Sequence, residues 1–257
     1  MSDPTRKFTD RATHYAAHRP SYAPEAIDEL LRGLPGVEAD EAGVLGTRGM
    51  PAADVGAGTG ISSRLLAGRG CRVFAVEPNE AMRRAAEPHP GVEFVEGTAE
   101  ATGLPDRDAV LVCCAQAFHW FDREPALTEF RRIATAPGRI GLVWNIRDPD
   151  DAFMQEYNAL IVRHAVAPIA SPWANDLDAA DVLRRHIGEP RAASFENADR
   201  LSFDQSAGRA LSASYAPNQG YAKETFIAEL AALFEKHAGP DGRVTWAYRT
   251  ETYVVDL

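Results

Sequence analysis

The chain has 257 residues, of which 45% are hydrophobic and 25% charged, a composition typical of globular proteins that excludes disordered, collagen-like and disulfide-rich classes. Its formal net charge is −10 and its basic residues are scattered among acidic ones, so we do not expect nucleic acid as a partner. The polar N-terminus, and the lack of an apolar run near the roughly 20 residues of a membrane span, predict a cytoplasmic protein without a membrane partner.

The N-terminal flank, residues 1–22, is polar and rich in aromatic residues, and Pro24 is expected to begin a helix. From residue 50 to residue 145, strand signals alternate with helix signals. The predicted strands are the runs 52–55, 71–76, 92–95, 109–114 and 140–144. The helices between them are expected after the glycine-rich loop 56–60, Asn79 and Asp122, and Pro137-Gly138 predict a turn before the last strand. This alternation is typical of a parallel sheet with helices on both faces.

The C-terminal flank has a different pattern. Helical spacing predicts helices over residues 150–166 and 222–238, whereas residues 167–190 are expected to be irregular apart from a short helical piece near Leu183. Residues 245–256 alternate as in an antiparallel strand. We therefore expect one domain over residues 1–257, with residues 1–22 as a lid and residues 150–240 as a helical cover over the substrate.

Neither the cysteines nor the histidines form a metal-binding pattern. Cys71, Cys113 and Cys114 lack the spacing of a zinc site, and adjacent cysteines cannot easily form an unstrained bridge, so we expect buried free thiols. His14 and His18 have the i,i+4 spacing of metal ligands, but no third ligand is nearby in the sequence. The sequence therefore predicts no metal.

The glycine-rich loop carries the main functional signal. Glycine lets the backbone turn sharply and approach a ligand closely, and open α/β sheets bind ligands at the carboxyl ends of their strands. Glu77 ends the next predicted strand, where a carboxylate can accept hydrogen bonds from both hydroxyl groups of a ribose. The loop and Glu77 together predict a site for a ligand that contains ribose.

Two residues argue against a dinucleotide in this loop. Ile61 stands where a dinucleotide-binding loop has its third glycine, and the carboxylate of Asp54 would repel a pyrophosphate but suit an ammonium or sulfonium group. A nicotinamide-dependent oxidoreductase is therefore disfavoured. A Walker loop is excluded because no Gly-Lys-Ser/Thr sequence follows.

Several segments along nearly the whole chain match the motifs of one known family. They are residues 8–12 with Tyr15, Arg19-Pro20 and Tyr22, then 54–60, 77–78, 97–100, 104–105, 117–121 and 212–217. Through them the chain resembles the class I S-adenosylmethionine-dependent methyltransferases, in particular the small-molecule branch called methyltransferase type 11, which includes trans-aconitate and quinone-pathway methyltransferases. The resemblance implies a doubly wound α/β fold with a seven-stranded, mainly parallel, Rossmann-like sheet and helical lid elements.

The resemblance also implies S-adenosylmethionine as the cofactor, with S-adenosylhomocysteine as the product. Asp54 would hold the amino group of the cofactor through water, and Glu77 would bind the ribose diol. The residues that would line the methionine and ribose portions are Gly56, Ala57 and Gly58.

The same resemblance places the adenine ring beside two further segments. Pro78 and Met82 would pack near the ring, and Ala99 would offer it a backbone N–H. Many class I enzymes carry Asp where this chain has Thr98, so recognition of the exocyclic amine is expected to differ here.

The methionine portion of the cofactor would lie near the end of the fourth strand. Ala115 and Gln116 would contact it there. Arg19 would pair with its carboxylate, with a surface salt bridge as the alternative, and Tyr15 would close over it as part of the lid.

The acceptor side of the site is expected to follow the fourth and fifth strands. His119 would take a proton from a hydroxyl, amine or carbon acid as the methyl group moves, and the alternative is a hydrogen-bonded structural histidine. Trp120, Asn145 and Tyr215 are the expected substrate contacts. Residues 144–147 end the fifth strand and are expected to reach the same region.

The predicted function is methyl transfer to an O, N or C nucleophile of a small molecule. One alternative is an enzyme that binds S-adenosylmethionine but cyclises or cleaves its aminobutyl arm, releasing methylthioadenosine. Another is a cofactor-binding module without catalysis, which the intact loop with Asp54 and Glu77 disfavours. The sequence predicts neither the acceptor nor the oligomeric state.

Overall fold

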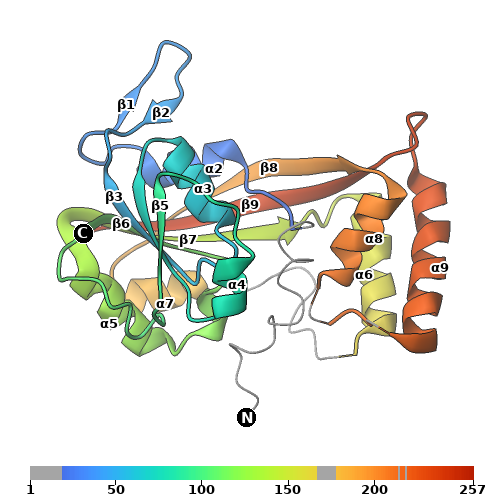
Figure 1. Ribbon diagram of the computed structural model, residues 1–257. Helices are drawn as coiled ribbons and strands as arrows, with labels where there is room; N and C mark the ends of the chain where they lie inside the picture. The colour runs from blue at the N-terminus through green and yellow to red at the C-terminus, as the bar shows by residue number, and fades with distance from the viewer. Residues whose placement is uncertain (1–18, 167–177, 214, 218) are drawn as a thin grey trace.

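A seven-stranded β-sheet forms the centre of the protein, shown in Figure 1 as a computed structural model that describes residues 19–166, 178–213, 215–217 and 219–257. The strand order is β5-β4-β3-β6-β7-β9-β8. Strand β9 runs antiparallel to both of its neighbours, and the other pairs are parallel. This confirms the predicted doubly wound, mainly parallel fold. The strands are β3 (Pro51–Val55), β4 (Arg72–Val76), β5 (Val92–Val95), β6 (Ala109–Ala115), β7 (Ala134–Arg147), β8 (Arg191–Leu201) and β9 (Val244–Asp256).

Helices cover both faces of the sheet, and each face has its own apolar core. The first core lies under α2 and α3, and the second under α5 and α7. Because successive strand residues point to opposite faces, Cys113 belongs to the first core and Cys114 to the second. Both are free, as is the buried Cys71, which confirms the prediction of buried thiols. The helices named so far are α2 (Pro24–Leu31), α3 (Ile61–Gly68), α5 (Arg123–Ile133) and α7 (Ala179–His186).

A third core lies beside the sheet. It joins α6 (Ala152–His164), α8 (Phe203–Leu211) and α9 (Gly220–His237) to the first half of β9, whose Trp246 is its largest buried side chain. Strand β9 pairs with β8 from Val244 onward but with β7 only from Tyr248 onward. The antiparallel pair of β8 and β9 therefore continues beyond the rest of the sheet and carries these helices, as Figure 1 shows.

The remaining described elements are short. Strands β1 (Glu38–Ala39) and β2 (Leu45–Gly46) form a small hairpin that projects from the body of the fold (Figure 1). Helix α4 (Glu80–Arg84) follows β4, and a 3₁₀ helix, η3 (Phe118–Trp120), follows β6. None of the described helices is both long and apolar enough to cross a membrane.

Most predicted elements are confirmed, and two predictions are wrong. Pro137-Gly138, predicted as a turn, lies inside β7. The pairing of β7 with β6 is irregular there, because residues 135–138 of β7 lie opposite the single residue Val110 of β6. Asp122 precedes α5 as predicted, but its side chain accepts no capping hydrogen bond. In contrast, the Asn79 side chain accepts from the N–H groups of Ala81 and Met82 and caps α4 as expected.

Candidate functional site

The glycine-rich loop joins β3 to α3 at the carboxyl end of the sheet. Gly56, Gly58 and Gly60 have φ values of 73°, 58° and 74°, in the left-handed region that other residues avoid. A Cβ atom on Gly56 would lie 2.7 Å from the Ala117 Cβ and 2.9 Å from a ring carbon of Phe121. Glycine is therefore required at position 56 both by the turn and by the close packing of the segment after β6.

Glu77 binds the glycine loop directly. It is 8% exposed at the end of β4, and its carboxylate accepts the Gly58 N–H at 2.9 Å and the Asn79 N–H at 2.8 Å. Burial raises the pKa of this carboxyl, and the two N–H groups and Arg83 oppose the rise. Each carboxylate oxygen can accept more than one hydrogen bond, so this arrangement also suits the two hydroxyl groups of a ribose.

Asp54 lies beneath the loop and is completely buried. Its Oδ2 atom accepts the hydroxyl groups of Ser62 and Ser63, both at 2.6 Å, and the Cys113 thiol lies 3.6 Å from Oδ1. Burial raises the pKa of Asp54, and these hydrogen bonds oppose the rise. Asp54 thus connects the end of β3 to the first turn of α3. Because its carboxylate is buried, it would interact with the amino group of a ligand only through the loop or through a water molecule.

The residues expected around an adenine ring follow Glu77 in the chain. The Met82 methyl group lies 3.4 Å from where a Cβ on Gly58 would stand, so the side chain of Met82 faces the loop. Met82 and Ala99 are buried, Pro78 is partly buried and Thr98 is exposed. The structure therefore brings Met82 against the glycine loop and leaves Thr98 open to solvent.

The segment that carries Thr98 and Ala99 is fastened to α5. Glu129 accepts the backbone N–H of Thr102 at 2.8 Å and its hydroxyl at 2.6 Å. Arg132 donates to Glu129 at 2.7 Å and to the Leu104 carbonyl at 2.8 Å. Sequence reasoning missed Glu129, because its partners lie far away in the sequence.

Replacing Glu129 with Gln is expected to lower the free energy of unfolding by about 1–3 kcal/mol, because the amide cannot satisfy both Arg132 and the Thr102 N–H. The hydrogen bond from Arg132 lowers the pKa of Glu129 from 4.5 to about 2. Its stabilising effect is therefore complete above pH 4.5 and is lost as the pH falls toward 2. Urea denaturation across this range should show a shallower loss of stability in the variant. An exposed control on the same helix, Glu124→Gln, should keep the wild-type slope, and equal slopes for the two variants would contradict the assignment.

The turn after β6 brings the expected methionine contacts together with the expected proton acceptor. Gln116 has a φ of 55°, and its side-chain oxygen accepts the backbone N–H of Asn145 at 3.0 Å. Ala115 is buried just before it. Because Ala117 packs on Gly56, this turn lies against the glycine loop. Residues of the turn and of the loop are therefore close enough to contact the same ligand.

His119 lies on η3 beside Trp120, with ring centroids 4.8 Å apart. Burial lowers the pKa of His119 to about 4, with smaller effects from the charges of Arg123 and Arg19. Its Nδ1 atom is buried and has no hydrogen-bond partner among the described residues, whereas Trp120 is 38% exposed. His119 is therefore a neutral imidazole at neutral pH, next to an exposed aromatic surface and two guanidinium groups.

Asn145 connects the start of the described chain to the sheet. Its amide nitrogen donates to the Ser21 carbonyl at 2.8 Å, and its amide oxygen accepts the Thr250 hydroxyl at 2.6 Å and the Asn197 amide at 3.1 Å. Both polar atoms of the Asn145 side chain, an expected substrate contact, are thus used in hydrogen bonds that hold the segment beginning at Arg19. Tyr15, the other expected lid residue, lies outside the described residues.

Tyr215 belongs to a cluster of aromatic and arginine side chains at the end of β7. Its hydroxyl accepts a hydrogen bond from Arg147, whose guanidinium also donates to the Asn158 side chain at 2.8 Å. That guanidinium lies 5.8 Å from the Tyr215 ring centroid and 5.5 Å from that of Tyr157. The sequence predicts a role for Tyr215 but only a helix over residues 150–166, which contains Tyr157, because helical spacing alone indicates burial.

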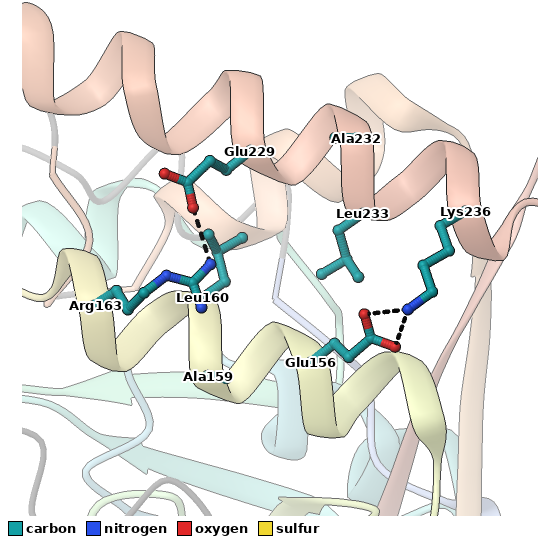
Figure 2. A pocket seen from close by; sticks show the side chains of 8 residues that line it. All are labelled: Glu156, Ala159, Leu160, Arg163, Glu229, Ala232, Leu233 and Lys236. Carbon is teal, nitrogen blue, oxygen red and sulfur yellow. Dashed lines mark hydrogen bonds and ion pairs between the residues drawn. The ribbon is translucent and has the colours of Figure 1, made fainter.

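A groove of about 400 Å³ between α6 and α9 contains none of the candidate residues. Figure 2 shows its apolar floor, with Leu160 and Leu233, and the ion pairs that close its two ends. Arg163 pairs with Glu229 at 2.9 Å, and Lys236 pairs with Glu156 at 2.7 Å. We assign this groove to the packing of the two helices. Among the described residues, no cluster of His, Cys, Asp and Glu is arranged to hold a metal ion.

Comparisons with known proteins agree with this arrangement. The sequence model of a methyltransferase-domain family matches residues 53–142, the span from β3 to β7 that contains the glycine loop, Glu77 and His119. An uncharacterized methyltransferase of Mycobacterium bovis is 38% identical over 169 residues, which are 63% of this chain and 61% of that protein. An uncharacterized methyltransferase of Schizosaccharomyces pombe is 31% identical over 64% of this chain and 62% of its own length. The match thus spans about three fifths of each of these relatives.

The fold has a solved counterpart as well. The structure of a proposed type II methyltransferase from Anaeromyxobacter dehalogenans superimposes with a TM-score of 0.65 and 26% sequence identity. The superposition covers 93% of this chain and 96% of the other. The similarity therefore includes the helical cover as well as the sheet.

Proposed function

We propose that this chain is a class I methyltransferase and that it catalyses S-adenosylmethionine-dependent methyl transfer to a small molecule. One observation carries the proposal: the Glu77 carboxylate and the Gly58 backbone form a single hydrogen-bonded unit at the carboxyl end of the sheet. The carboxylate can bind the two hydroxyl groups of a ribose, and the backbone without side chains leaves room for the group attached to that ribose.

The residues around this unit fit the cofactor. Gly56, Ala57 and Gly58 would lie along its methionine and ribose portions, and Met82, whose methyl group faces Gly58, would lie beside the adenine ring. When bound, S-adenosylmethionine supplies a methyl group on a positively charged sulfur atom, which is electrophilic. The buried carboxylates of Asp54 and Glu77 favour a cation nearby, and Arg19 would pair with the cofactor carboxylate.

The remaining proposed cofactor contacts are Pro78, Thr98, Ala99, Ala115 and Gln116, and the proposed acceptor contacts are Trp120, Asn145 and Tyr215. Holding donor and acceptor in line supplies much of the rate of a displacement reaction. The segment that precedes α2 is proposed to exclude water as a lid, because Asn145 and Asn197 hold its Ser21 carbonyl over the strand ends.

His119→Ala is expected to lower turnover by about 10²-fold or more, the scale of general base catalysis, if the acceptor must lose a proton. The pKa of His119 is lowered to about 4, so the imidazole is in its proton-accepting form at all higher pH values. Wild-type turnover should therefore show no titration near the usual histidine pKa of about 6.5. Steady-state kinetics over this pH range, with cofactor affinity measured by calorimetry, test this. Full activity of the variant removes His119 from the chemistry.

The proposed function is tested by incubating the protein with labelled S-adenosylmethionine and a small-molecule library, followed by mass spectrometry of the product and of the spent cofactor. We expect S-adenosylhomocysteine together with a methylated acceptor. Methylthioadenosine in its place would identify an enzyme that uses the aminobutyl arm. Calorimetry that detects no cofactor binding would refute both activities.

A further inference from the structure

The two helices that form the groove between α6 and α9 share one sequence motif. Residues 153–164 of α6 and residues 226–237 of α9 both read Phe-x-x-Glu-x-x-Ala-Leu-x-x-Arg/Lys-His. Each side chain that lines the groove is the Glu, Ala, Leu or basic residue of this motif, taken once from each helix. The groove is therefore built from two copies of the same helical segment.

The contacts between the two helices repeat in the same way. The Nε2 atom of His237 lies 3.1 Å from the Glu156 carboxylate, and that of His164 lies 3.1 Å from the Glu229 carboxylate. Each of these histidine rings also lies 5.7 Å from the phenylalanine that opens the motif of the other helix. The start of each segment thus meets the end of the other, so α6 and α9 run antiparallel and a local two-fold axis passes through the groove.

The charges around the groove alternate in sign. Arg163 and Glu229 lie 2.9 Å apart at one end, and Glu156 and Lys236 lie 2.7 Å apart at the other, as Figure 2 shows. These side chains are 41–61% exposed, and their charges add to zero. A uniformly acidic or basic partner would therefore meet as much repulsion as attraction here.

This pattern of charges is complementary to a second copy of itself. If a two-fold axis between the copies runs along the helices, α6 of each copy lies against α9 of the other. Arg163 then faces Glu229 of the second copy and Glu156 faces Lys236 of the second copy, so every charge has an opposite neighbour. Helices that crossed at right angles would bring like charges together. The charges thus favour helices that lie along one another, as in a four-helix bundle.

The apolar side chains beside the groove favour the pairing of α6 with α9. Val162 near the end of α6, Val166 just after it and Tyr221 at the start of α9 are 59%, 63% and 82% exposed. Because the helices are antiparallel, these side chains lie at the same end of the pair, and packing α6 against α9 of the second copy brings the two apolar ends together. Packing α6 against α6 would place Val162 at the opposite end, where the exposed Glu235 has the equivalent position in α9.

Two exposed alanines allow a close approach between the copies. Ala159 and Ala232 are the small residues on the two sides of the groove, and Leu160 and Leu233 form its floor. Side chains of a facing helix can enter a groove of this kind and remove its apolar floor from water.

We propose that the protein forms a two-fold dimer in which α6 of each copy packs against α9 of the other. The interface consists of the groove together with Val162, Val166 and Tyr221. This inference goes beyond the proposed function and does not depend on it, because none of the residues proposed for the cofactor or the acceptor lines the groove.

The test measures the association of the full chain. Sedimentation velocity between about 1 and 200 µM should show a shift from monomer to dimer, because two helices per copy form an interface of modest area. Ala159→Arg places a long charged side chain in the groove and should raise the dimer dissociation constant by at least about 10-fold. The matched control, Ala198→Arg, changes an exposed alanine of β8 and should leave the constant unchanged.

A charge exchange tests which helices face one another. Arg163→Glu sets an acid against Glu229 of the second copy and should weaken the dimer by about 10-fold. The double variant Arg163→Glu/Glu229→Arg restores opposite charges within each copy and between copies, so its dissociation constant should return to within about threefold of the wild type. If α6 packed against α6, the new acid would face Glu156 of the second copy and the double variant would stay dissociated.

A wild type that stays monomeric up to about 200 µM overturns the proposal and leaves the groove to a different protein. A dimer that Ala159→Arg and Ala198→Arg weaken equally has its interface elsewhere, which overturns the proposal as well. A double variant that stays dissociated overturns the pairing of α6 with α9. These results leave the proposed function unaffected, since cofactor binding and product formation test it separately.

Discussion

Among Gly→Ala substitutions in the glycine-rich loop, Gly56→Ala is expected to cause the largest loss of stability. An L-residue at a φ of 73° costs roughly 1–2 kcal/mol, and the new Cβ would overlap Ala117 and Phe121, which adds roughly 1–3 kcal/mol. The backbone must then move, so we also expect cofactor affinity to fall by at least about 10-fold. Urea denaturation and calorimetric titration measure the two effects.

A matched control separates strain from overlap. Gly36 has a φ of 76°, and a Cβ there would meet nothing within 4 Å. Gly36→Ala should therefore lose only the conformational part, roughly 1–2 kcal/mol, and keep the wild-type cofactor affinity. Equal losses of stability in the two variants would show that the packing of Ala117 and Phe121 on the loop is unimportant.

Glu77→Ala is expected to give the second large effect. It removes the acceptor for the partly buried N–H group of Gly58 and the buried N–H group of Asn79, and a buried N–H left unsatisfied costs about 1–3 kcal/mol. Cofactor binding should weaken by roughly 1–3 kcal/mol, or about 5- to 150-fold, because hydrogen bonds to the ribose are lost as well.

The control for Glu77 is Glu96→Ala, which removes an acid whose side chain is 78% exposed in its ion pair with Arg83. Because the Glu96 carboxylate is well exposed to water, its ion pair contributes little, and stability and cofactor affinity should stay near their wild-type values. An unchanged dissociation constant in Glu77→Ala would count against the ribose-binding role.

The central part of the fold was predictable because its strands are apolar on both sides. Runs such as 109–114 are buried in two cores at once, and the glycines at 56–60 mark the point where the chain turns into a helix. Strand β8 gave no comparable signal. It lies at the edge of the sheet and nearly all of its residues are at least partly exposed, so neither apolar periodicity nor apolar content marks it.

The candidate site was predictable only where its residues lie next to strand ends. The loop and Glu77 follow consecutive parallel strands, and such ends meet at one edge of the sheet. The hydrogen bonds of Asp54 to Ser62 and Ser63 depend on how α3 packs, which no spacing rule specifies. The partners of Arg147 come from α6, from β9 and from the segment after α8, and local sequence patterns cannot predict such contacts.

The long antiparallel pair of β8 and β9 limits how this protein can be recombined with its relatives. Trp246 belongs to the core of the cover, while Val254 of the same strand belongs to the core under α2 and α3. A chimaera that exchanged the cover would have to splice through the middle of a strand, and a slip of one residue at the joint would turn every following side chain to the opposite face. Any exchange of the cover therefore also changes a strand of the central sheet.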